Sequence, residues 1–172
     1  METCAPRITA CSRHARVVEH AAARSDYAEL ALIGFSMGGN LTLKYLGEGA
    51  FPIDSRIKKA VVFSVTCDLA SSARKMASAA NSIYMTRFLR MLHAKIRAKM
   101  EAWPDSLDDA EYRRIKTFEQ FDDRYTAPLH GFEDAADYYR QASCGQFLDR
   151  VTIPSLLVNA RNDPFLAGGC YP

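Results

Sequence analysis

A serine lies between two glycines in the stretch ALIGFSMGGN, which covers residues 31–40. The pattern G-x-S-x-G is typical of a nucleophile elbow, a sharp turn from a strand into a helix that exposes a serine hydroxyl. We expect Gly34 and Gly38 to be needed as small residues because the backbone is crowded on both sides of such a turn. The pattern also arises by chance, so the elements around it must agree with it. With that agreement, Ser36 is the candidate nucleophile of an acyl transfer reaction.

Acyl transfer by a serine needs a base, a carboxylate that orients the base, and N–H donors for the oxyanion. Asp163 is the candidate carboxylate because it follows an apolar run and precedes a proline that ends that run. An aspartate before a proline is also a common turn residue, and this alternative stays open. The backbone N–H of Met37 is the candidate oxyanion donor. A second donor normally comes from a loop that follows an earlier strand.

The base is missing from its usual place. In enzymes with such an elbow, the catalytic residues follow one another along the chain as serine, acid, then histidine. No histidine follows Asp163. Of the four histidines, only His130, in the stretch TAPLHGF, lies in a segment that could overhang the serine. A place in the inserted helical region suits His130 better, and we expect the catalytic histidine to be absent from this chain.

Three apolar runs predict the strands that would position these residues. They cover residues 31–35, 60–65 and 153–160. A helix between the first two runs predicts a parallel crossover, and the proline in the third run lies near its start, where a missing donor is tolerated. Three parallel strands leave both sheet edges open, so we expect the chain to be a piece of a longer enzyme.

Two helices are predicted beside these strands. A loose helical period over residues 9–24 predicts a helix that leads into the first strand. Residues 41–46 continue the turn at Ser36 as a second helix, with Gly47 and Gly49 placed to end it.

The region between the second and third strands is rich in helix formers and interrupted by prolines, which predicts a mostly helical insertion. We therefore expect a sheet-containing core made of residues 1–65 and 146–172, and a helical cap made of residues 66–145.

The longest predicted helix of the cap covers residues 83–100 and contains no acidic residue. Its apolar residues at helical spacing are Met85, Phe88, Leu89, Leu92, Ile96 and Met100, and its basic residues are Arg87, Arg90, Lys95, Arg97 and Lys99. One interpretation is a packed cap helix with a solvated basic face, which the acidic residues that follow would balance. The other is contact with an anionic membrane surface or with lipid headgroups.

Composition limits the remaining classes of function. The chain has 172 residues, 48% of them hydrophobic, and a net charge of +2, which is ordinary for one globular domain and too small to indicate nucleic-acid binding. It has no zinc-ligand spacing, P-loop or dinucleotide fingerprint, so we expect neither a metal nor a cofactor. Five scattered cysteines and the lack of a long apolar run favour a cytoplasmic location, with or without membrane association.

Several further motifs accompany the elbow. They are GFSMGGN running into LKYLGE (34–48), CDL (67–69), NSIY (81–84), TAPLHGF (126–132), DYY (137–139), ASC (142–144) and DPF (163–165). Together they resemble family 4 of the AB hydrolase superfamily, the YheT-like hydrolases of bacteria and their eukaryotic lipid-hydrolase relatives. The resemblance covers roughly residues 28–166.

The resemblance implies a partial α/β-hydrolase fold, in which helices flank a parallel sheet and a helical cap is inserted. It also implies that Ser36 is the nucleophile and Asp163 the triad acid of an enzyme that hydrolyses carboxylic esters without a cofactor. Short- and medium-chain acyl esters and acylglycerol lipids are the implied substrates. The sequence departs from the family pattern in three ways: the early strands are absent, the chain stops before the final strand and histidine, and Asn162 stands where an aspartate is frequent.

Two other interpretations stay open. In the first interpretation, the chain is a non-catalytic hydrolase-like module that binds acyl ligands or a membrane surface through its cap. In the second interpretation, it is an elbow enzyme of another reaction class, such as an acyltransferase or a thioesterase.

Overall fold

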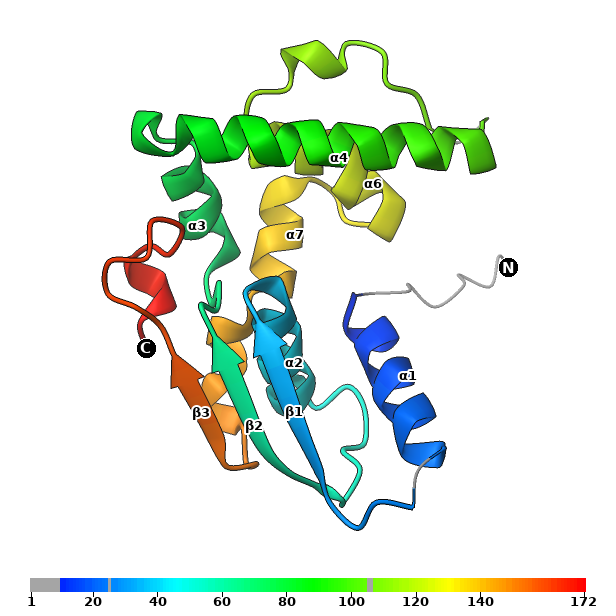
Figure 1. Ribbon diagram of the computed structural model, residues 1–172, viewed down its shortest axis with the longest axis vertical. Helices are drawn as coiled ribbons and strands as arrows, with labels where there is room; N and C mark the ends of the chain where they lie inside the picture. Colours follow the sequence, from blue (N-terminus) through cyan, green and yellow to red (C-terminus); the bar gives the residue numbers. More distant parts are fainter. Residues whose placement is uncertain (1–9, 25, 105–106) are drawn as a thin grey trace. The chain divides into compact units, whose positions relative to one another are not determined.

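Three parallel strands carry the candidate residues at one edge of a sheet (Figure 1). The computed structural model describes residues 10–24, 26–104 and 107–172, and within them the strand order is β1 (Leu30–Phe35), β2 (Ile57–Phe63), β3 (Ser155–Val158). Phe35 pairs with Phe63, and Phe63 pairs with Val158, so the carboxyl ends of all three strands are level. Loops that leave these ends therefore start side by side.

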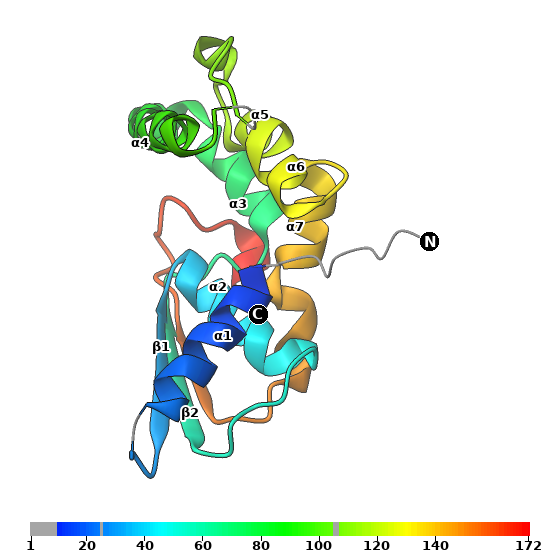
Figure 2. The same ribbon diagram turned by 90° about the vertical axis from the view of Figure 1, so that its right-hand side faces the viewer.

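Helices cover one face of this sheet. Figure 2 shows α1 (Ala10–Ala23) and α2 (Met37–Glu48) on the same side of the strands. One buried cluster joins them to β2, and a second joins α2 and β2 to the short helix η4 (Cys144–Arg150). The first cluster consists of Ala15, Val18, Tyr45, Leu46, Ile57 and Ala60. These contacts fix α2 against the strand that follows it.

The opposite face of the sheet carries apolar side chains that no described residue buries. Ile33 and Phe35 of β1 are 65% and 66% exposed, and Leu156 of β3 is 58% exposed. The rings of Phe35 and Phe63 stack with their centroids 5.2 Å apart on neighbouring strands. Parallel sheets are normally covered on both faces, so this face has the composition of an interior surface.

The remaining helices are short, apart from α4 (Ser82–Ala102). They are α3 (Leu69–Met76), η1 (Ala79–Asn81), η2 (Tyr112–Arg114), α5 (Phe118–Phe121), the π-helix η3 (Asp122–Thr126), α6 (Ala127–His130), α7 (Ala135–Ala142) and η5 (Gly168–Cys170). Met85, Leu89 and Ile96 are the buried residues of α4. Phe88, which we expected on the packed side with them, is 37% exposed, and its ring lies 5.8 Å from that of Phe118.

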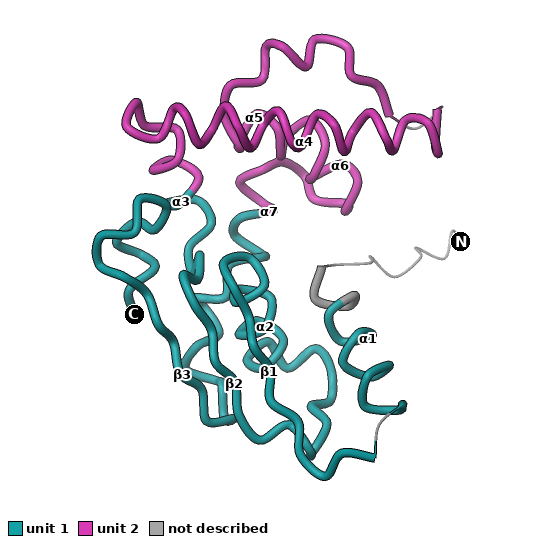
Figure 3. The backbone as a smooth tube through the Cα atoms, in the orientation of Figure 1, with its two compact units in different colours: residues 1–72, 139–172 teal, residues 73–138 magenta. Residues whose placement is uncertain are grey.

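The chain divides into two compact units (Figure 3). Residues 73–138 form a helical unit, and the residues up to 72 together with 139–172 form the sheet unit. The chain passes between the units within α3 and α7. Assignment of these parts as hydrolase core and cap stays a prediction.

Both predicted helices of the sheet unit are confirmed, with different ends. The helix expected over 9–24 is α1, and the elbow helix begins at Met37, directly after the serine. Gly49 ends it with φ of 74° in the left-handed region. Gly47 was wrongly expected to end it: this residue is buried inside α2, where a Cβ would lie 2.3 Å from the carbonyl oxygen of Phe147.

No helix within the described residues is both long enough and apolar enough to span a lipid bilayer.

Candidate active site

Ser36 occupies a strained turn between β1 and α2. Its φ is 50° and its ψ is −119°, a combination that residues with a side chain rarely adopt. Such strain costs about 1–3 kcal/mol and persists only where the surrounding structure imposes it. The Ser36 N–H donates to the carbonyl oxygen of Phe63 at 2.8 Å, and the Ser36 carbonyl accepts from the N–H of Asn40 at 3.1 Å. The residue is exposed, so the turn presents its side chain to solvent.

Close backbone packing explains why the chain turns here. A Cβ at Gly34 would lie 2.7 Å from the carbonyl oxygen of Gly38 and 2.7 Å from the Cα of Gly39, so β1 and α2 approach too closely for a side chain. A Cβ at Gly39 would lie 2.7 Å from a methyl carbon of Val65. The expectation for Gly38 is wrong, because a Cβ there meets no described atom within 4 Å. The second residue that must be small is Gly39.

Met37 is the first residue of α2. Its backbone N–H is one of the first four of the helix, which have no intrahelical acceptor. The N-terminus of a helix also carries a partial positive charge that stabilises an anion. The N–H at this position is therefore suited to an oxyanion next to Ser36.

Asp163 lies beyond the carboxyl end of β3. Its N–H donates to the carbonyl oxygen of Ala160 at 3.1 Å, and one of its carboxylate oxygens accepts from the N–H of Phe165 at 2.8 Å. The carboxylate therefore takes part in a turn, as the alternative interpretation of this residue predicts. The strands that lead to Ser36 and Asp163 have one strand between them, so the axes of these two strands lie roughly 10 Å apart.

No contact within the described residues identifies a base for Ser36. Within the described part of the chain, no side chain forms a hydrogen bond with the Ser36 hydroxyl. His14 of α1 packs its ring 5.5 Å from that of Tyr45, and burial lowers the pKa of its imidazole. His130 ends α6 in the helical unit, away in sequence from the residues that form the turn.

Two asparagines that the sequence did not mark hold the segments around the turn. Asn40 is completely buried, and its amide donates to the carbonyl oxygen of Ala142 and accepts from the N–H of Cys144, both at 2.8 Å. Asn159 accepts from the N–H of Val65 at 2.8 Å and donates to the carbonyl oxygen of Cys170 at 2.7 Å. Three of these four partners are 94 to 104 residues away in sequence, which leaves no local signal.

Ser64 is a second strained serine, also at a strand end. Its φ is 49°, it is exposed, and its N–H donates to the carbonyl oxygen of Val158 at 2.9 Å. Because Phe35 pairs with Phe63, Ser64 is the neighbour of Ser36 on the adjacent strand. No glycine pattern surrounds Ser64, which is why the sequence did not indicate it.

Buried thiols lie under this edge of the sheet and do not resemble nucleophiles. Cys67 and Cys144 are 1% and 0% exposed. The neighbouring Cys67 thiol and burial raise the pKa of Cys144, while the Cys144 thiol lowers the pKa of Cys67. The described residues contain no group of three or more His, Cys, Asp or Glu side chains placed to hold a metal ion.

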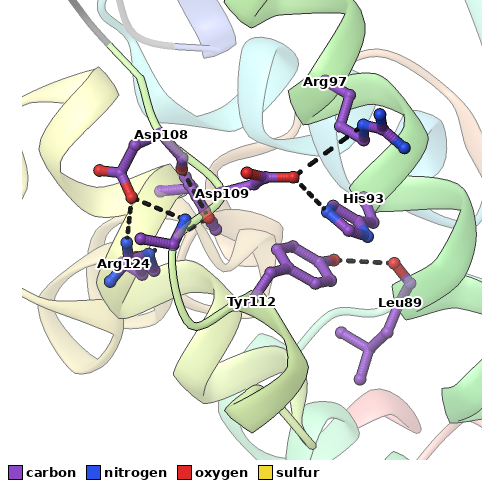
Figure 4. A network of polar contacts seen from close by, with 9 residues as sticks. Leu89, His93, Arg97, Asp108, Asp109, Tyr112 and Arg124 are labelled. Atoms are coloured by element: carbon purple, nitrogen blue, oxygen red, sulfur yellow. Dashed lines mark hydrogen bonds and ion pairs between the residues drawn. The ribbon is translucent and has the colours of Figure 1, made fainter.

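A histidine and a carboxylate are paired in the helical unit instead (Figure 4). His93 of α4 lies 2.9 Å from a carboxylate oxygen of Asp109, and its ring stacks on Tyr112 with centroids 4.0 Å apart. The Tyr112 hydroxyl donates to the carbonyl oxygen of Leu89 at 2.7 Å. The hydrogen bond from His93, helped by the guanidinium of Arg97, lowers the pKa of Asp109. With no nucleophile in the group, this pair attaches the segment before η2 to α4.

Most of the chain matches a known protein family. A model of the alpha/beta hydrolase fold matches residues 6–167. This chain belongs to the alpha/beta hydrolase fold family. The parallel sheet and flanking helices are thus a partial α/β-hydrolase fold, as the motifs predicted.

Three similar proteins have names of ester or lipid hydrolases. The Escherichia coli protein YheT, named as an esterase, is 33% identical over 144 residues, which are 81% of this chain and 41% of YheT. The human monoacylglycerol lipase ABHD2 is 29% identical over 153 residues, which are 80% of this chain and 35% of ABHD2. The mouse phospholipase ABHD3 is 29% identical over 159 residues, which are 91% of this chain and 38% of ABHD3.

The chain spans well under half the length of each of these relatives. No solved structure matches it significantly.

Proposed function

We propose that this chain carries the nucleophile of a carboxylic ester hydrolase that acts on lipid-like esters. The observation that carries the proposal is the backbone of Ser36, an exposed serine held at φ of 50° between β1 and α2. Strain of this kind is expected where a turn must present a nucleophile. The names of YheT, ABHD2 and ABHD3 support an ester or lipid as substrate. Short- and medium-chain acyl esters and acylglycerols are the proposed range.

The proposed reaction follows from these positions. The Ser36 oxygen attacks the ester carbonyl carbon, the alcohol leaves with a proton, and water then releases the acid from the acyl-serine. The Met37 N–H donates to the oxyanion, and Asp163 orients the base that takes the serine proton. Since the described residues place no base at Ser36, we assign the activity to the whole protein and expect the 172-residue chain to be inactive in isolation.

Steady-state hydrolysis of p-nitrophenyl esters and monoacylglycerol by the whole protein tests this assignment. Replacement Ser36→Ala should lower kcat by about 10³-fold or more, because it removes the attacking atom. Ser64→Ala is the matched control, since Ser64 is also an exposed serine with positive φ at a strand end. Its kcat should stay within about threefold of the unmodified protein. Full activity of Ser36→Ala would refute the proposal.

The role of Asp163 needs its own test, because its carboxylate also forms a turn. Asp163→Asn keeps an oxygen for the N–H of Phe165 but no longer stabilises a charged base, so kcat should fall by about 10²-fold or more. Asn162→Asp, one residue away and exposed, is the control and should change kcat little. Unchanged kcat in Asp163→Asn would show that this residue stabilises the turn and has no catalytic role.

A non-catalytic module is the second candidate, favoured by the Ser36 hydroxyl having no hydrogen-bond partner in the described residues. Such a module would bind acyl ligands without turnover, and Ser36→Ala would not change its affinity for them. Cytoplasmic location and peripheral membrane contact through residues 83–100 belong to both candidates as proposals.

A further inference from the structure

One side of α4 is buried and the other faces solvent with apolar residues along it. Met85, Leu89 and Ile96 form the buried side. On the opposite side, Ile83 is 81% exposed and Met91 is 50% exposed. These two residues are eight positions apart, so at 100° per residue they lie about 80° apart around the helix and bound one exposed strip, called the apolar line below. An exposed apolar line on a helix whose opposite side is already packed is not required for folding.

Basic residues flank this exposed line. Arg87, Arg90, Lys95 and Lys99 are all exposed, and none of them forms an ion pair within the described residues. At 100° per residue, Arg90 lies on one side of the line, Arg87 lies within it, and the two lysines lie on the other side. No acidic residue occurs in α4 before Glu101. The acidic residues that follow the helix therefore do not neutralise this surface, with the exception of Asp109 beside Arg97.

A hollow lies at the first turns of this surface. It has a volume of about 410 Å³ and is lined by Ser82, Ile83, Thr86, Arg87 and Arg90. Two guanidinium groups and two hydroxyl groups around one hollow match the oxygens of a phosphate diester.

We infer that the exposed face of α4 docks on a bilayer that contains anionic phospholipids. Arg87 and Arg90 bind headgroup phosphates, the lysines lie over neighbouring headgroups, and Ile83 and Met91 enter the acyl boundary. The exposed apolar line distinguishes this partner from a nucleic acid, which would contact the charges and leave Ile83 in water. The inference deepens the membrane contact proposed above and names its residues and lipid class.

Flotation of the 172-residue chain with vesicles tests this docking. The chain should float with vesicles of phosphatidylcholine and phosphatidylserine but not with pure phosphatidylcholine, and added salt should release it. Equal binding to both kinds of vesicle, or binding to neither, would overturn the inference.

Charge variants locate the surface. The double variant Arg87→Gln, Arg90→Gln should bind about 30-fold more weakly, since each basic residue near an anionic surface contributes about fivefold. Arg113→Gln, Arg114→Gln is the matched control, because it removes two exposed arginines of η2 in the same unit. It should weaken binding less than about threefold. Equal losses in both double variants would contradict a site on α4.

Apolar variants separate a bilayer from other anionic partners. Ile83→Ser, Met91→Ser should weaken vesicle binding about tenfold or more, because buried apolar groups contribute to interfacial binding. Heparin is a polyanion without an apolar phase. Added heparin should displace this variant from vesicles no more strongly than it displaces the unmodified chain. Unchanged vesicle binding of this variant would instead indicate a general polyanion site. Circular dichroism of each variant verifies the helical fold.

These experiments test membrane docking and ester hydrolysis independently of each other. Ser36→Ala should leave vesicle binding unchanged, because Ser36 lies in the sheet unit and α4 in the helical unit. A whole protein that binds vesicles but does not hydrolyse esters would contradict the proposed activity alone. A protein that hydrolyses esters but does not bind vesicles would contradict the docking surface alone.

Discussion

The two units hold their residues of interest in different ways. In the sheet unit, Ser36 and its neighbours depend on close backbone packing at Gly34, where a Cβ would lie 2.7 Å from the carbonyl oxygen of Gly38, and on the buried side-chain amide of Asn40. In the helical unit, the residues of interest are exposed side chains of α4, and a change there disturbs little around it. The difference indicates that the first unit is built to fix atoms in place and the second to present a surface. Small substitutions should therefore be costly in one unit and nearly neutral for folding in the other.

The largest expected effect on stability is that of Asn40→Ala. This change leaves the N–H of Cys144 and the carbonyl of Ala142 buried without their partner, and each such group costs about 1–3 kcal/mol. We expect the free energy of unfolding to fall by about 4 kcal/mol in urea titrations followed by circular dichroism. Asn162→Ala, at an exposed position, should change it by less than about 0.5 kcal/mol. Similar effects of the two changes would contradict the structural role of Asn40.

A smaller loss is expected for Gly34→Ala. The added Cβ meets backbone atoms of Gly38 and Gly39, which cannot rotate away, so the free energy of unfolding should fall by about 3 kcal/mol. Gly38→Ala is the sharpest comparison, because its Cβ enters open space within a helix. It should be neutral or stabilise the protein by up to about 1 kcal/mol, measured in the same titrations. The reverse order of the two variants would mean that β1 and α2 are not packed as described.

The smallest expected effect lies in the helical unit and depends on pH. The pKa of the Asp109 carboxyl is lowered from 3.8 because His93 donates a hydrogen bond to it. The carboxylate therefore stabilises the folded state above pH 3.8, and this contribution is lost as the pH falls below that value. Asp109→Asn should lower the urea midpoint at pH 7 and make little difference below pH 3.8.

Fluorescence of Trp103 follows this transition, since it is the only tryptophan and lies in the helical unit. Glu119→Gln is the control, because Glu119 is exposed and forms no ion pair within the described residues. An equal loss for Asp109→Asn at both pH values would show that packing, not charge, carries the effect.

Local patterns were sufficient to predict the elements. Residues 83–100 were predicted as a helix and lie within α4, and the turn at Ser36 lies between a strand and a helix as expected. Strand ends were less predictable. The second strand was expected over 60–65 and covers Ile57–Phe63, because Ser64 has φ of 49° and leaves the extended region early.

Contacts between residues far apart in the chain could not be predicted from the sequence. Whether Gly38 or Gly39 must be small depends on Val65, which packs against the helix from the segment after β2. Asn40 and Asn159 acquire their roles from partners that only the folded chain brings near. Phe88 has the spacing of a packed residue, yet it lies at the edge of the buried side of α4 and stays 37% exposed.

The central claim is that Ser36 is the activated serine of this hydrolase. It is tested most directly by treating the whole protein with a fluorophosphonate probe and mapping the modified peptide by mass spectrometry. Trypsin separates Ser36 from Ser64, because Lys44, Arg56 and two further lysines lie between them. Modification of the peptide that ends at Lys44, abolished by Ser36→Ala, is the result that we predict. Modification of the Ser64 peptide alone, or of neither peptide, would contradict the account.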